Sequence, residues 1–145
     1  MVFSPKVNDK LKIGPETYTI TEHPAAKGMP YGQAGRRATV YQLSTTRNEF
    51  RALKVFNAIY RTDDTRVQAE KLSKYAMLPG MIACKRIVLS PIQYPDLRNR
   101  LKSLQYAVIM PCVEGTTWQE LIMNKEVLDK NQCQALADGF LQTMV

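Results

Sequence analysis

The stretch Phe50-Arg-Ala-Leu-Lys-Val-Phe56 places one lysine at the centre of a mostly apolar, β-prone run. Such a run predicts a strand. Burying an ammonium group without a partner is costly, so we expect Lys54 to meet a carboxylate, a phosphate or both. A second β-prone run at residues 38–43 precedes it, and the polar residues 44–48 between them predict a β-hairpin over 38–56.

The remaining elements follow from periodicity and from stop signals on both sides of this hairpin. Further strands are predicted over residues 18–21, 85–90 and 104–110. Helices are predicted from Thr62 to about Leu78, over 117–124 and over 130–145. Irregular structure is predicted for an N-terminal arm at 1–17 and a loop at 23–35. The order predicts an α+β fold, with a five-stranded antiparallel sheet, one packed helix and two later helices.

Composition limits the class of protein. The 145 residues are 45% hydrophobic and 23% charged, which indicates one globular domain. No apolar run approaches the roughly 20 residues of a membrane span, and the first residues do not resemble a signal peptide, so we expect a cytoplasmic location. Three widely spaced cysteines and a single histidine argue against a disulfide framework or a metal site. A net charge of +7 favours phosphates, nucleic acid or acidic proteins as partners, although it is also an ordinary solubility charge.

Three features around Lys54 have a chemical meaning together. The turn that begins at Gly32 contains small residues, which let a backbone approach phosphate oxygens. Ala52 lies on the same face of the strand as Lys54 and leaves room for a flat ring. Glu70, in the predicted helix, is a carboxylate that can hold the ammonium group. Taken singly, each feature has a plainer reading: a hairpin turn, a solvated lysine, and a surface Glu70 that pairs with Lys74.

In combination these features resemble the ATP-binding N-terminal lobe of the protein kinase family. That family has Gly-x-Gly-x-x-Gly-x-Val, then Ala-x-Lys, then a helical Glu that pairs with the Lys. Ala52-Leu-Lys54 matches, and Glu70 lies at a fitting distance. Alignment on Val40 keeps the middle glycine, because the three glycine positions fall on Gln33, Gly35 and Ala38. The resemblance implies that these residues bind ATP, with Lys54 at the α- and β-phosphates and Glu70 holding Lys54.

Residues 106–118 are similar to the family's fifth strand and hinge. The resemblance implies that Met110 is the gatekeeper behind the adenine, and that the backbone groups of Pro111 and Val113 bind the adenine edge. It also implies a division of the chain into an arm at 1–17, an N-lobe at 18–110, a hinge at 111–116 and the start of a C-lobe at 117–145.

The family's catalytic aspartates belong to His-Arg-Asp and Asp-Phe-Gly motifs, and neither motif occurs in these residues. We therefore expect a serine/threonine-type kinase lobe that binds ATP weakly and is inactive alone, with the Mg²⁺ ligands in a missing C-lobe. The apolar stripe on the last helix is expected to contact that lobe or to self-associate; it consists of Cys133, Leu136, Phe140 and Met144.

Two other functions remain open. The first is a pseudokinase-like scaffold that binds nucleotide or protein without catalysis. The second, less favoured because the residues form no RNA-binding signature, is a nucleic-acid-binding domain that would use a basic set. That set is Lys85, Arg86, Arg98, Arg100 and Lys102, together with nearby tyrosines.

Overall fold

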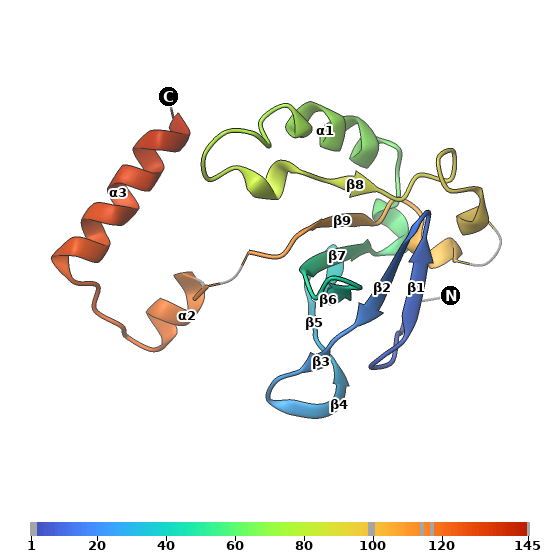
Figure 1. Ribbon diagram of the computed structural model, residues 1–145, viewed down its shortest axis with the longest axis horizontal. Coiled ribbons are helices and arrows are strands. Elements are labelled where there is room, and N and C mark those ends of the chain that lie inside the picture. The colour runs from blue at the N-terminus through green and yellow to red at the C-terminus, as the bar shows by residue number, and fades with distance from the viewer. Residues whose placement is uncertain (1–2, 99–100, 114, 117, 145) are drawn as a thin grey trace.

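A computed structural model of the chain describes residues 3–98, 101–113, 115–116 and 118–144 (Figure 1). Within these residues, seven strands pair antiparallel in one curled sheet. They are β1 (Lys10–Ile13), β2 (Glu16–Ile20), β5 (Gly32–Ala34), β6 (Ala38–Thr45), β7 (Phe50–Phe56), β8 (Ile87–Val88) and β9 (Val108–Pro111). Their order is β1-β2-β6-β7-β9-β8, and β5 also pairs with β6. The predicted α+β class is confirmed, but the predicted sheet of five strands is too small.

The sheet begins in the segment that was expected to be an irregular arm. Leu11 and Ile13 of β1 are buried, whereas Lys10 and Lys12 are exposed. This alternation is the pattern of a half-buried strand, although only four residues show it. Gly14 has a φ of +59°, which lets the chain turn directly from β1 into β2. Residues 10–17 therefore belong to the sheet.

The predicted loop at residues 23–35 contains strands of its own. β3 (Glu22–His23) and β4 (Ala26–Pro30) form a separate two-stranded sheet, and β5 then rejoins the main sheet. β5 can join the main sheet because β6 is long enough for both β2 and β5 to pair along the same edge of it. Residues 43–45 pair with β2, and residues 39–41 pair with β5.

The main core covers one face of the sheet. Leu53 and Ile109 sit at its centre and are almost completely buried, and Leu89 and Leu104 cover them from the segment between β8 and β9. Removing such a side chain from water contributes about 1.5–3 kcal/mol. The face that holds Leu53 is therefore the main source of stability, and it is opposite to the face that holds Lys54.

The helix α1 (Asp64–Ser73) lies on the Lys54 face and ends earlier than predicted. Its Ala69 packs with Val88 and Val108. The strands β8 and β9 are also shorter than predicted. Pairing continues past β8, since the amide of Leu89 donates to Ala107 O at 2.8 Å, but Tyr106 has a φ of +60° and interrupts the extended backbone.

The C-terminal helices α2 (Trp118–Met123) and α3 (Lys130–Met144) form where the sequence predicts them. Figure 1 shows both of them standing away from the sheet. Among the described helices, none is both long enough and apolar enough to cross a membrane.

Candidate functional site

Lys54 lies in a row of side chains that crosses the sheet. Gln33 of β5 is the register partner of Val40 on β6, which is the partner of Lys54 on β7. Lys54 in turn pairs with Val108 on β9. Directly paired residues of antiparallel strands share a face, so the predicted loop residues and Lys54 point to the same side.

This row borders a surface hollow of about 300 Å³, here called the Lys54 hollow. Two cationic residues, Lys54 and Arg37, line it. None of its lining residues is an Asp or a Glu, so the hollow favours an anionic ligand. Its residues are Gln33, Ala34, Gly35, Arg37, Ala38, Val40 and Lys54. The structure thus brings together the predicted loop positions and the lysine, and adds Ala34 and Arg37.

The loop over the hollow is held by the end of β7. Asn57 donates its side-chain amide to Arg36 O at 3.0 Å and its backbone amide to Arg37 O at 2.9 Å. The Arg37 guanidinium lies 5.6 Å from the centre of the Tyr60 ring. The Gly35 amide donates to Ala38 O at 2.9 Å. This hydrogen bond within the turn competes with one from the same amide to a phosphate oxygen. A Cβ at Gly35 would lie 3.3 Å from the same oxygen of Ala38, so a larger residue would require a small shift of this turn.

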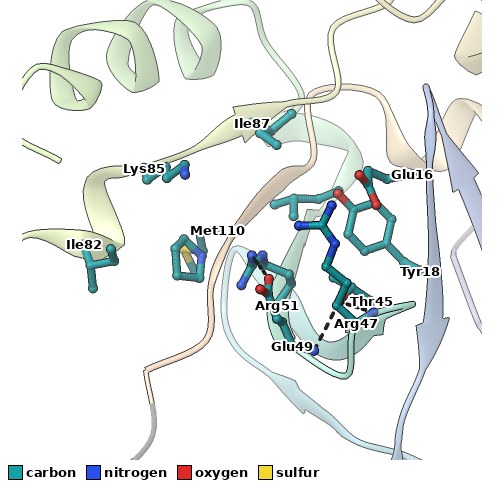
Figure 2. Close-up of a pocket in the computed structure, with 12 residues that line it drawn as sticks. Glu16, Tyr18, Thr45, Arg47, Glu49, Arg51, Ile82, Lys85, Ile87 and Met110 are labelled. Carbon is teal, nitrogen blue, oxygen red and sulfur yellow. Dashed lines mark hydrogen bonds and ion pairs between the residues drawn. The ribbon is translucent and has the colours of Figure 1, made fainter. Parts of the chain in front are cut away.

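The predicted adenine-binding residues occupy the neighbouring part of the sheet. Ala52 is the register partner of Met110, so both share the face of Lys54. Neither lines the Lys54 hollow. Met110 and Pro111 instead line a larger pocket (Figure 2), and Val113 is 68% exposed. Glu114, in the predicted hinge, lies outside the described residues.

Glu70 does not pair with Lys54. Arg66 Nη1 donates to Glu70 Oε1 at 2.8 Å, one helical turn earlier, and the Glu70 side chain is 63% exposed. Lys54 Nζ lies 5.3 Å from the centre of the Phe56 ring and, in the described part of the chain, has no carboxylate within 4.0 Å. The expected ion pair is therefore absent there, although α1 does lie over the correct face. The alternative pairing of Glu70 with Lys74 is not formed either.

Arg66 also organises the start of α1. Asp63 is the N-cap residue, but its carboxylate accepts hydrogen bonds from Arg66 Nε at 2.9 Å and Nη2 at 2.8 Å instead of from backbone amides. These hydrogen bonds lower the pKa of Asp63 and raise the pKa of Arg66. An arginine four residues before Glu70 is visible in the sequence, and it is the signal that the prediction missed.

No cluster of three or more His, Cys, Asp or Glu side chains that could hold a metal ion occurs among the described residues. Comparison of the chain with known protein families, curated proteins and solved structures finds no match to any of them.

Proposed function

We propose that this chain is the nucleotide-binding lobe of a serine/threonine-type protein kinase, which binds ATP over the Lys54 face of the sheet. One observation carries the proposal: Lys54 and Arg37 line a hollow without carboxylates, under a loop of small residues. A phosphate chain is the ligand that this charge and shape fit, because it offers several anionic oxygens to two cations and a narrow turn.

The residues have separate roles in this proposal. Lys54 binds phosphate oxygens, and its half-buried position limits where its ammonium group can reach. Ala52 leaves the adjoining surface open to the adenine ring, bounded by Met110, while the backbone of Pro111 and Val113 meets the adenine edge. ATP supplies the phosphoryl group, and Mg²⁺ would be held by residues of a C-lobe. Transfer to a protein hydroxyl needs an aspartate that accepts the hydroxyl proton, and the proposal assigns that step to motifs outside these 145 residues.

A second candidate is a pseudokinase-like scaffold, in which the same lobe binds nucleotide or protein without catalysis. The pairing of Glu70 with Arg66 favours it, because Lys54 then lacks the carboxylate that positions it. The hydrogen bond from the Gly35 amide to Ala38 O also favours the scaffold, because this amide is already used within its own turn. Both candidates predict an anion in the Lys54 hollow, and they differ in whether the complete protein transfers phosphate.

The first test is a titration of the ¹⁵N-labelled chain with Mg-ATP, followed by backbone amide shifts. We expect a dissociation constant on the order of 1 mM, because the nucleotide is enclosed on one side only. The shifts should concentrate on residues 33–40 and on Lys54. Lys54→Ala should weaken binding roughly tenfold or more, since it removes a hydrogen bond between charged groups.

Lys10→Ala is the matched control, because Lys10 is an exposed strand lysine distant from Lys54 in the strand order. It should bind Mg-ATP as the unmodified chain does. Equal affinity of the Lys54→Ala chain would refute the assignment of Lys54, and low-micromolar affinity would contradict a one-sided site.

A further inference from the structure

A second cavity lies on the other side of the sheet from Lys54. It has a volume of about 390 Å³ and is called the Arg47 pocket here (Figure 2). Register pairs place its walls on the Leu53 face: Tyr18 opposite Thr45, and Ile87 opposite Ile109. Cavities of this size are within the range that holds small ligands. It shares Met110 and Pro111 with the proposed adenine position but no lining residue with the Lys54 hollow.

The floor of the Arg47 pocket is apolar. The Tyr18 ring and Ile109 belong to the buried core. Ile82 and Ile87 line the pocket while remaining 55% and 42% exposed, so they present aliphatic surface to solvent. A ligand with an apolar body would cover them and gain the free energy of removing that surface from water.

The rim of the pocket is cationic. Arg51 is paired with Glu49, so this pair contributes little net charge. Arg47 and Lys85 have no carboxylate within 4.0 Å among the described residues. Figure 2 shows Arg47 on the side of Tyr18 and Glu16, and Lys85 on the side of Ile82 and Met110. An anion that enters the pocket would therefore face one cation on each side.

The turn that presents Arg47 is fixed by its own hydrogen bonds. The backbone amides of Arg47 and Glu49 both donate to Thr45 Oγ1, at 3.2 and 3.1 Å. Asn48 completes the turn with a φ of +59°. The guanidinium group therefore projects from a defined backbone position, which lowers the entropy lost on binding.

Tyr18 adds a neutral donor. Its ring is buried, and its hydroxyl has no hydrogen-bond partner among the described residues, yet it is not sealed from solvent. Burial, followed by the neighbouring Glu16 carboxylate, raises the pKa of this hydroxyl, so it keeps its proton at neutral pH. It can therefore donate to an anion. Glu16 repels additional negative charge, which disfavours phosphates and dicarboxylates.

We propose that the Arg47 pocket binds a small monocarboxylate with an apolar body. The carboxylate lies between Arg47, Lys85 and the Tyr18 hydroxyl, and the apolar body lies on Ile82, Ile87 and Ile109. This site has no lining residue in common with the Lys54 hollow, and it is inferred without use of the proposed nucleotide binding.

The test is an amide-shift titration of the ¹⁵N-labelled chain with three probes of one shape: 4-phenylbutyrate, 4-phenylbutanamide and 4-phenylbutylamine. We expect 4-phenylbutyrate to shift the amides of residues that line the Arg47 pocket and to bind most tightly of the three. Arg47→Gln and Lys85→Gln should each weaken it roughly three- to tenfold, because each removes one charged contact at a partly exposed rim.

Arg86→Gln is the matched control, because Arg86 is exposed, adjacent to Lys85 in sequence and not part of the pocket lining. It should leave the affinity for 4-phenylbutyrate unchanged. The proposal fails if the amine binds as tightly as the carboxylate, or if Arg86→Gln weakens binding as much as Lys85→Gln. It also fails if no shifts occur, or if they occur only on α3 or around the Lys54 hollow.

Discussion

Arg66 determines the electrostatics on the α1 side of the Lys54 face. Its guanidinium contacts Asp63 at one end and Glu70 at the other, within two turns of α1. Both carboxylates could otherwise interact elsewhere, Asp63 with backbone amides of the first turn and Glu70 with a cation on the sheet. The charge state of this group of three residues is therefore set within the helix.

The pH dependence of this group can be measured at Asp63. Its pKa is lowered by hydrogen bonds from Arg66, so its contribution to stability is fully present above the unfolded-state pKa of about 3.9. That contribution is lost as the pH falls through the lower pKa of the folded chain. Arg66→Gln should bring the pKa of Asp63 back toward about 3.9, as measured by ¹³C NMR titration of the carboxyl carbon. Lys71→Gln in the same helix is the control, and an unchanged Asp63 midpoint in the Arg66→Gln chain would contradict this account.

At the level of elements, the two faces of β7 have different roles, one in the core and one in the candidate site. Odd-numbered residues such as Leu53 and Val55 enter the core, whereas Ala52 and Lys54 form the candidate site. A central strand that buries leucine and valine on one face can accept a lysine on the other, because the two faces have different neighbours.

Leu53→Ala should therefore destabilise the chain by about 2–5 kcal/mol, the cost of a cavity at a fully buried leucine. Urea denaturation monitored by circular dichroism measures this change in the free energy of unfolding. Ile59→Ala is the matched control, since Ile59 is 80% exposed and should change the free energy of unfolding by less than about 0.5 kcal/mol. Equal effects of the two substitutions would show that β7 is not central to the core.

The elements differ in how well the sequence predicts them. The hairpin of β6 and β7 is predicted to within a few residues, because both strands are long and joined by a local polar turn. β1 was missed because it has only four residues, and β5 because it has only three, of which one is Gly32. Strand ends near Leu89 and Tyr106 were overestimated, since a left-handed residue is not visible in a β-prone pattern.

The candidate site was predictable to the extent that it depends on strand register. Val40, Ala52 and Lys54 share a face as the alternation requires. The partner of Glu70 was not predictable from its spacing to Lys54 along the sequence. Arg66 on the same helix competes with Lys54 for this carboxylate, and a local pair costs less conformational entropy. The Arg47 pocket was not predicted at all, since its walls come from segments that meet only in the folded chain.

At the scale of the whole molecule, the C-terminal helices leave apolar side chains exposed. Leu136 is 37% exposed and Phe140 is 59% exposed on α3, and Cys133 is exposed as well. The side chain of Met144, the fourth member of the expected stripe, lies outside what the structure describes. We propose that this stripe contacts a C-lobe or, in this chain alone, a second copy.

Sedimentation velocity at several concentrations tests the self-association of α3. The apparent mass should rise with concentration in the unmodified chain, and Leu136→Lys should shift it toward the monomer, because it places a charge within the stripe. Gln142→Lys adds the same charge away from Leu136 on the helix and should leave the mass unchanged. A monomer at all concentrations would rule out self-association.

The strand order also fixes when each surface is completed as the chain leaves the ribosome. Residues 33–54, which line the Lys54 hollow, are all translated before α1, and the hairpin of β6 and β7 needs no later segment to close. The Arg47 pocket requires residues from Glu16 to Pro111, so β9 must arrive before its walls meet. All residues of the anion-binding Lys54 hollow therefore leave the ribosome before the last wall of the Arg47 pocket does. A nascent chain stalled before β9 would contain every residue of the Lys54 hollow but would lack Ile109, Met110 and Pro111 of the Arg47 pocket.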